Sequence, residues 1–149
     1  MRAVVQRVSR ARVTVGDRVV GECGPGVVVL LGISPADGPA EARWLADKVA
    51  NLRIFNDDEG KMNLSLGEVG GAALVVSQFT LYGDARRGRR PSFIRAAQGP
   101  EAEALYEEVV RAFRALGIET ATGEFGAMMD VELVNAGPVT ILLDSDKTF

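Results

Sequence analysis

Residues 27–33 read Val-Val-Val-Leu-Leu-Gly-Ile, and together with Gly26 they form the longest apolar run of the chain. The run is far shorter than the roughly 20 apolar residues that a membrane-spanning helix needs. It is rich in Val and Leu and follows a Gly-Pro-Gly break, which is typical of a buried strand. A second apolar segment, residues 72–79, follows two glycines and predicts a second buried strand.

Other strand-like segments lie outward from these two. Segments 12–15 and 18–22 flank Gly16-Asp17, which predicts a hairpin with a two-residue turn. Segment 55–66 has no clear period and is predicted to be irregular. Alternating or apolar patterns predict further strands at 4–8, 118–121, 129–135 and 139–143, and helical spacing of apolar residues predicts helices at 41–53 and 100–116.

The order of these elements limits the fold class. About seven strands and two helices are predicted, and the helices do not alternate regularly with the strands. This order disfavours a doubly wound parallel sheet. We predict an α+β fold with a curved, barrel-like, mostly antiparallel sheet and two covering helices. A length of 149 residues suits one domain, so we expect residues 1–149 to form a single domain.

The composition is that of an ordinary globular protein, with 47% hydrophobic and 25% charged residues. The first residues lack the apolar block of a signal peptide, and Cys23 has no second cysteine to pair with. We therefore expect a cytoplasmic protein without a membrane span. A net charge of −3 argues against a protein that binds nucleic acid over its whole surface, but it is compatible with a local basic patch.

The chain contains no histidine. Ser-His-Asp and Cys-His catalysis are therefore excluded within this chain. A zinc site would have to use one cysteine and carboxylates, which is disfavoured, so we expect no metal and no cofactor. Any chemistry must come from hydroxyls, carboxylates, Lys or Arg, backbone amides, or the substrate.

Ser77-Gln78-Phe79-Thr80 lies where the second buried strand runs out into a loop. The simpler interpretation is a polar strand end. As a catalytic segment it lacks a base that could deprotonate Ser77 or Thr80, since Asp84 is the nearest carboxylate and an exposed Asp is a weak base. A turn of backbone amides can stabilise an oxyanion without any titrating side chain. The nucleophile would then be water or a group on the substrate.

Four arginines follow this segment within five residues: Arg86, Arg87, Arg89 and Arg90. A solvated loop is the simpler interpretation. Guanidinium groups also bind phosphate in a bidentate manner, so a small basic patch beside a candidate site suits a phosphodiester substrate.

Two further segments leave alternatives open. Gly137-Pro138 interrupts two strand-like segments and is either a hairpin turn or a special backbone geometry. Residues 125–129, which include Phe125 and Met129, either belong to the core or line an apolar cleft.

Taken in order, the motifs of this chain resemble those of the D-aminoacyl-tRNA deacylase family. The resemblance spans the whole chain, and five ordered motifs are more specific than any one of them. The matching segments are residues 1–8 (MRAVVQRV), 77–84 (SQFTLYGD), 88–93 (GRRPSF), 125–128 (FGAM) and 137–140 (GPVT).

The resemblance implies hydrolysis of the ester between a D-amino acid and the 3′-terminal adenosine of tRNA. Glycyl-tRNA, including glycine mischarged on alanine tRNA, is implied as a substrate, whereas L-aminoacyl-tRNA is excluded. The implied fold is a homodimer with its site at the interface, where residues 77–80 of one subunit face a cis Gly137-Pro138 of the other. Arg7 is implied to fix that Gly-Pro geometry. Phe125 and Met129 are assigned here to the substrate pocket, and the four arginines to tRNA.

The implied chemistry agrees with the absence of histidine. Backbone donors near Gln78, Phe79 and Thr80 would stabilise the oxyanion, and the ribose 2′-hydroxyl of the terminal adenosine would help. One residue departs from the family pattern, because Ala136 stands where an acidic residue commonly precedes Gly137. Two other functions remain open: a non-catalytic tRNA-binding module and a general small esterase.

Overall fold

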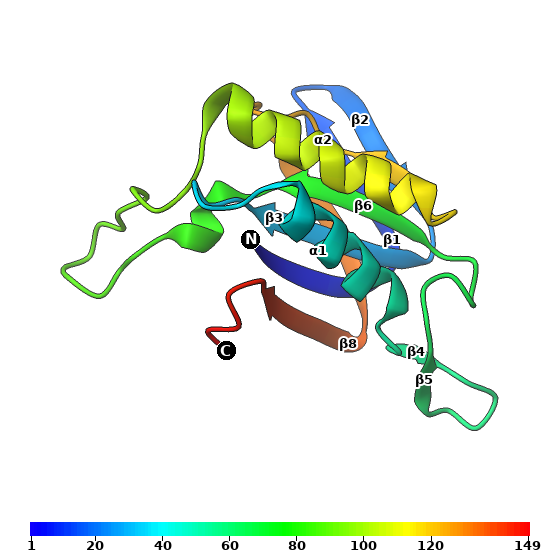
Figure 1. Cartoon of the computed structure of the whole chain (residues 1–149). Helices are drawn as coiled ribbons and strands as arrows, with labels where there is room; N and C mark the ends of the chain where they lie inside the picture. Colours follow the sequence, from blue (N-terminus) through cyan, green and yellow to red (C-terminus); the bar gives the residue numbers. More distant parts are fainter.

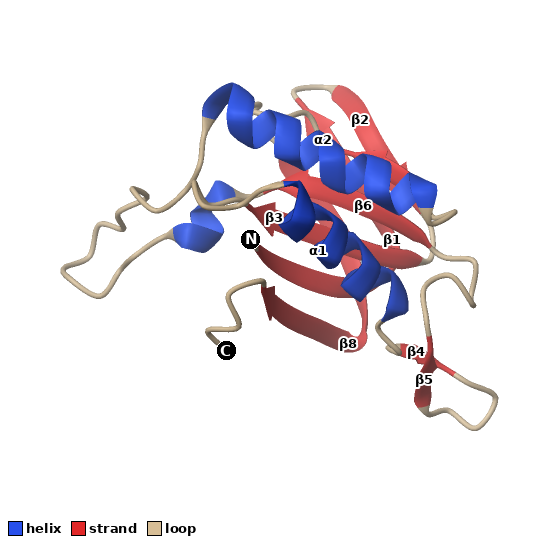
Figure 2. Ribbon diagram, viewed as in Figure 1, coloured by secondary structure: helices blue, strands red, loops and turns tan.

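Strand β3 (Gly26–Gly32) lies in the middle of a six-stranded sheet. The computed structural model describes residues 1–149, and Figures 1 and 2 show two helices, α1 (Pro39–Asn51) and α2 (Gly99–Ala115), covering one face of this sheet. The strand order is β2-β1-β3-β6-β7, with β8 paired to the other edge of β1. The bounds of these strands are β1 Arg2–Val15, β2 Arg18–Cys23, β6 Ala72–Ser77, β7 Glu119–Thr122 and β8 Asp130–Asp144.

The sheet is mixed. Strand β1 pairs antiparallel with β2, β3 and β8, whereas β3–β6 and β6–β7 are parallel pairs. Each parallel pair is connected through a helix, α1 for the first and α2 for the second, because a parallel connection must cross from one end of the sheet to the other. The prediction of a curved, mostly antiparallel α+β sheet with two covering helices is confirmed, since three of the five strand pairs of this sheet, including the longest one, are antiparallel.

Both faces of β3 are buried, which explains its continuous apolar sequence. Val27, Val29 and Leu31 belong to the larger core under the helices, with exposed fractions of at most 1%. Val28 faces the other way, into a smaller core that includes Val13 and β6 residues. The second core exists because β2 and part of β8 fold back over the sheet and give it a barrel-like shape.

Several predicted boundaries differ from the structure. Segments 4–8 and 12–15 are one strand, β1, and segments 129–135 and 139–143 are one strand, β8. Residues 55–66 were predicted to be irregular, but they contain a small hairpin of β4 (Phe55–Asn56) and β5 (Met62–Leu64). The second buried strand ends at Ser77 and continues as a short 3₁₀ helix, η1 (Phe79–Tyr82). No helix is long and apolar enough to span a membrane.

The closure of the sheet depends on a close backbone approach at Gly21 in β2. A Cβ atom at this position would lie 2.0 Å from the carbonyl oxygen of Thr122 in β7. Only a residue without a side chain allows the two strands to approach so closely.

We predict that Gly21→Ala lowers the free energy of unfolding by about 1–3 kcal/mol, because β2 must move away from β7. Urea denaturation measures this change. Gly24→Ala is the matched control, since a Cβ at Gly24 has no neighbour within 4 Å, and we expect a change below about 0.5 kcal/mol. Equal stability of the two variants would contradict this account of closure.

Candidate active site

The candidate catalytic turn begins where β6 ends beside β3. Ser77 pairs with Leu31, and the backbone amide of Gln78 donates a 2.7 Å hydrogen bond to the Leu31 carbonyl. The chain then turns through η1 directly above Gly32. A Cβ at Gly32 would lie 3.0 Å from the Leu81 Cβ and 3.2 Å from the Gln78 carbonyl oxygen, so the turn rests tightly on the end of β3.

The turn presents two backbone amides without partners. The N–H groups of Leu81 and Gly83 donate to carbonyls within the turn, at 3.2 and 2.9 Å. Those of Phe79 and Thr80, at the start of η1, donate to no group in the chain, as is usual for the first amides of a helix. These are the donors that an oxyanion would need.

The hydroxyl of Thr80 has no base beside it. It accepts a hydrogen bond from the side-chain amide of Gln78. The nearest carboxylate in sequence, Asp84, is held by Arg86 at 2.6 Å. Hydrogen bonds from the Arg86 side chain and amide hold the pKa of Asp84 far below its usual range. Asp84 is therefore a very weak base, and Thr80 is not activated as a nucleophile.

A pocket of about 500 Å³ opens beside the turn. It brings together Ser77, Gln78 and Phe79 with Phe125 and Met129, all of which the sequence had indicated. Thr80 stands on the same turn but does not line the pocket. The remaining lining residues are Val76, Ala97, Gln98, Gly99, Gly126, Ala127, Met128 and Val131. None of the residues that line the pocket carries an ionisable side chain, so acid–base chemistry there needs backbone, water or substrate groups.

Aromatic contacts hold the two walls of the pocket. The Phe125 ring lies 5.7 Å from the ring of Tyr106 on α2, and the Phe79 ring lies 5.2 Å from Phe93 in an edge-on arrangement. The Tyr106 hydroxyl donates to the carbonyl of Val75 at 2.8 Å, and burial raises the pKa of Tyr106 to about 12. This tyrosine therefore stays neutral and serves as a wall support.

The sequence did not indicate that the start of α2 lines this pocket. Ala97 and the N-cap residue Gln98 precede α2, Gly99 is its first residue, and these three residues close one side of the cavity. The sequence predicted a helix that begins at Pro100, but nothing in the sequence showed what the start of this helix would contact.

Gly137 and Pro138 lie in a wide bulge of β8. Between the paired positions Val8↔Asn135 and Gln6↔Thr140, β8 contains three more residues than β1. The Gly137-Pro138 peptide bond is cis, as the resemblance implies. The Asn135 side chain accepts a hydrogen bond from the Val139 amide at 3.1 Å and thereby closes the bulge.

Arg7 lies opposite this bulge and links it to the segment after α1. Its Nε donates to the Ala136 carbonyl at 3.0 Å, and its Nη1 donates to the Ile54 carbonyl at 2.8 Å. A Cβ at Gly137 would lie 2.9 Å from the Arg7 Nη2. Ala136 takes part through its carbonyl, so alanine in place of an acidic residue keeps this contact.

The bulge and the pocket do not meet within one chain. Ser77 aligns with Leu31 and, across β3, with Ala3, whereas Gly137 lies opposite Arg7. The two features are thus offset by four residues along the direction of β1, and the strands β1 and β3 lie between them. Neither Gly137 nor Pro138 lines the pocket.

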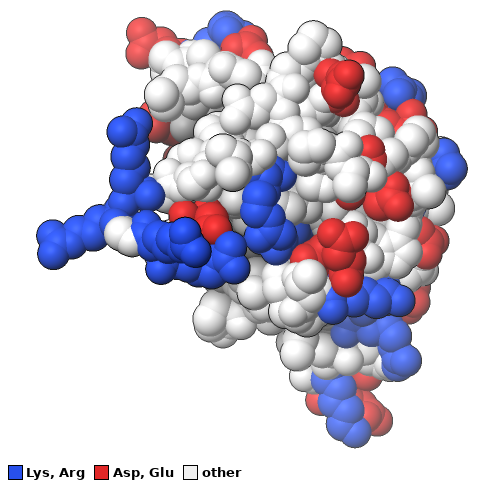
Figure 3. Space-filling view, turned by 60° about the vertical axis from the view of Figure 1, so that its left-hand side comes forward, with Lys and Arg blue, Asp and Glu red and all other residues white.

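The arginine loop projects from the body directly after the turn (Figure 1), and Figure 3 shows Lys and Arg side chains gathered on that side. A bridge between Asp84 and Ser92 closes the loop. Arg86 is paired with Asp84, but the other three arginines, Arg87, Arg89 and Arg90, form no ion pair or hydrogen bond. These three guanidinium groups are free to bind an anion.

Comparisons with known proteins agree with this geometry. A family model described as D-Tyr-tRNA(Tyr) deacylase matches residues 4–144. The chain is 66% identical to the D-aminoacyl-tRNA deacylase of Symbiobacterium thermophilum, over 100% of this chain and 99% of that protein. It is 62% identical to the D-aminoacyl-tRNA deacylase of Desulfatibacillum aliphaticivorans, over 97% of this chain and 99% of that protein.

Solved structures share the fold. A structure titled c-Myc DNA Unwinding Element Binding Protein matches with a TM-score of 0.91 and 41% identity, over 97% of this chain and 99% of that one. A probable eukaryotic D-amino acid tRNA deacylase matches with a TM-score of 0.81 at 20% identity, over 95% of this chain and 97% of that one, which supports the fold alone. Fold and sequence together place the chain in the class of deacylases, which are hydrolases. Within this class, the chain belongs to the D-Tyr-tRNA(Tyr) deacylase family.

Proposed function

We propose that this enzyme hydrolyses the ester that joins a D-amino acid to the 3′-terminal adenosine of tRNA, and so removes D-residues before translation uses them. The observation that carries the proposal is a pocket without ionisable side chains, bounded by a turn whose Phe79 and Thr80 amides are free. Backbone donors of this kind stabilise the oxyanion that forms when a nucleophile adds to an ester carbonyl. We assign the enzyme to the cytoplasm, where charged tRNA is used.

The nucleophile in this proposal is water. Water adds to the carbonyl carbon, the bond to the ribose 3′ oxygen breaks, and that oxygen leaves with a proton. Thr80 cannot start the reaction, because its hydroxyl accepts from Gln78 and has no base beside it. The ribose 2′-hydroxyl lies next to the ester in the substrate itself. We assign to it the transfer of a proton from the attacking water to the leaving 3′ oxygen.

Strand β8 supports a homodimer. It pairs only with β1, so its second edge is unpaired, and Val134 and Leu142 on this strand are 40% and 57% exposed. A long unpaired edge with exposed apolar side chains favours pairing with another copy of the chain. In such a dimer, Gly137-Pro138 of one protomer acts at the pocket of its partner. The same residues do not reach the pocket of their own chain.

Discrimination between D- and L-aminoacyl-tRNA would then depend on backbone groups rather than on side chains. Carbonyl groups around the Gly137-Pro138 bulge, which Arg7 holds in place, would bind the α-amino group of the substrate. They would also occupy the direction that an L side chain takes, and a rigid site discriminates well by exclusion. Glycine has no side chain to exclude, so glycyl-tRNA, including glycine mischarged on alanine tRNA, is accepted. Phe125 and Met129 would contact the aminoacyl end within the pocket.

The arginine loop would bind the phosphates near the tRNA 3′ end. Arg87, Arg89 and Arg90 are unpaired and follow the catalytic turn directly, whereas Arg86 is oriented by Asp84. Phosphate contacts fix the register of a nucleic acid without reading its sequence. This arrangement suits an enzyme that accepts many tRNA species.

We predict that a D-aminoacyl-tRNA is hydrolysed at least about 100-fold faster, in kcat/KM, than the same tRNA carrying the L-amino acid. Release of amino acid from the two charged tRNAs measures this ratio. Equal release of both would favour a general esterase, and no release with retained binding would favour a tRNA-binding module.

The same assay separates the substrate-assisted route from a Thr80 nucleophile. Thr80→Val is expected to keep kcat within about threefold, since no step uses the hydroxyl. A terminal 2′-deoxyadenosine is expected to lower kcat by about 10-fold or more. A Thr80→Val enzyme that binds substrate normally but loses turnover would contradict the substrate-assisted route.

For the arginine loop we predict a change in the salt dependence of tRNA binding. Replacing Arg87, Arg89 and Arg90 with Ala should reduce the slope of log K against log salt by about 2, because each lost contact with single-stranded RNA contributes about 0.7. Fluorescence anisotropy of a labelled tRNA measures the slope. The control is a variant in which Arg43 of α1 and Arg111 of α2 are replaced by Ala. An equal reduction of the slope in this control would refute a specific role of the loop.

A further inference from the structure

Arg2, the first residue of β1, connects the catalytic turn to the end of β8. Its Nε donates to the Asp144 carboxylate at 3.2 Å, and its Nη1 donates to the Leu81 carbonyl in η1 at 3.1 Å. The guanidinium carbon also lies 4.7 Å from the centre of the Tyr82 ring, within the range of a cation–π contact. One side chain thus joins elements that are distant in sequence.

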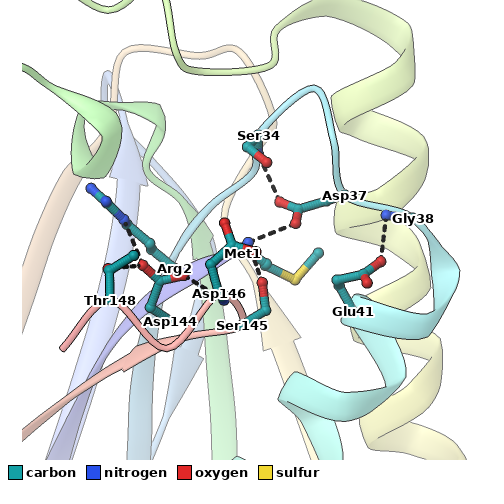
Figure 4. Close-up of polar contacts among 10 residues, drawn as sticks. All are labelled: Met1, Arg2, Ser34, Asp37, Gly38, Glu41, Asp144, Ser145, Asp146 and Thr148. Atoms are coloured by element: carbon teal, nitrogen blue, oxygen red, sulfur yellow. Dashed lines mark hydrogen bonds and ion pairs between the residues drawn. The ribbon is translucent and has the colours of Figure 1, made fainter.

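The carboxylate that orients Arg2 is itself fixed. The Asp144 side chain is 1% exposed, and Figure 4 shows it surrounded by Arg2, Asp146 and Thr148. It accepts hydrogen bonds from the Asp146 amide at 2.9 Å and from the Thr148 hydroxyl. Burial raises the pKa of Asp144, but these hydrogen bonds and Arg2 outweigh it, so the pKa lies below its usual value. Asp144 therefore stays ionised at neutral pH.

The backbone that carries Arg2 is held as well. The Met1 carbonyl accepts from the Ser145 amide at 2.8 Å, and the Met1 α-amino group donates to Asp37 and to the Ser145 hydroxyl, both at 2.7 Å (Figure 4). Asp37 is fixed in turn by the amide of Ser34 at 2.7 Å. Because these bonds fix the backbone beside Arg2, the hydrogen bond from its side chain to Leu81 holds the turn in a defined position.

The η1 turn is held at Leu81 by its hydrogen bond with Arg2. Gly32 supports η1 from below, and the Gln78 amide anchors its start. No backbone amide donates to the Leu81 carbonyl, and Arg2 is its hydrogen-bond donor. A 3₁₀ turn this short has little stability of its own. Small displacements of catalytic donors cost large factors in rate.

We propose that Arg2, oriented by Asp144, is a positioning residue that holds the Leu81 carbonyl and so fixes the free amides of Phe79 and Thr80. The proposal rests on the proposed function, because it assigns those amides to the oxyanion. Arg2 itself touches neither the pocket nor the substrate.

The test compares Arg2→Met with Arg10→Met in the full-length protein. Arg10 offers a matched control, because it is also an arginine of β1 that pairs with a carboxylate on β8, Glu132, at 3.0 Å, but its side chain is 66% exposed and remote from the turn. We expect Arg2→Met to lower kcat about 10-fold or more with KM within about threefold. Arg10→Met should leave both unchanged.

Hydrogen exchange at the amides of Leu81 and Gly83 gives a readout that does not need activity. In Arg2→Met we expect both amides to exchange about 10-fold faster or more, while amides of β3 keep their protection. If Arg2→Met does not fold, Asp144→Asn keeps the shape of the side chain and weakens the orientation of Arg2, and the same local change is expected.

The outcomes separate the two proposals. Unchanged exchange at Leu81 and Gly83 in an active enzyme would overturn the positioning role and leave the deacylase function standing. Faster exchange in a protein whose wild type releases no amino acid would support the hold of Arg2 on the turn and overturn the proposed function. Loss of kcat with faster exchange supports both.

Discussion

Strand β3 is buried on both faces, and its parallel pairing with β6 determines where the candidate active site begins. Leu31 aligns with Ser77, and the Leu31 carbonyl receives the Gln78 amide at 2.7 Å, the last bond before the chain turns away. A one-residue shift would move every side chain of β3 into the opposite core, which is packed around different residues, so the register is fixed by packing on both faces. The position of η1, and with it the free amides of Phe79 and Thr80, therefore follows from the core.

The site built on this turn contains no ionisable side chain in its lining. Charged groups outside the pocket serve as supports: Arg2 holds the turn and Asp84 orients Arg86, while Arg7 holds the separate Gly137 bulge. Such a division suits a reaction in which positioned dipoles stabilise developing charge and the substrate supplies the proton carrier. It also explains how a chain without histidine can serve as a hydrolase.

The apolar pattern was sufficient to predict the class of fold, both helices and the buried strands. It split β1 because Ser9 and Arg10 interrupt the apolar alternation, and a bulge at that place keeps the strand continuous. The residues of the turn, Phe125 and Met129 were found from motifs. Gln98 was not, because contacts across the sheet depend on tertiary packing. Arg2 was missed because an arginine at a strand end looks solvated until its partner Asp144 is located.

In the proposed enzyme, a pocket in one protomer works with the Gly137-Pro138 bulge of its partner. Mixed subunits test this arrangement. Ala127→Trp fills the pocket and Gly137→Val distorts the bulge, so each homodimer should be inactive. Co-expression of the two variants should restore about a quarter of wild-type activity, because half of the dimers then contain one intact site. A mixture that stays inactive, with heterodimers present, would contradict the account.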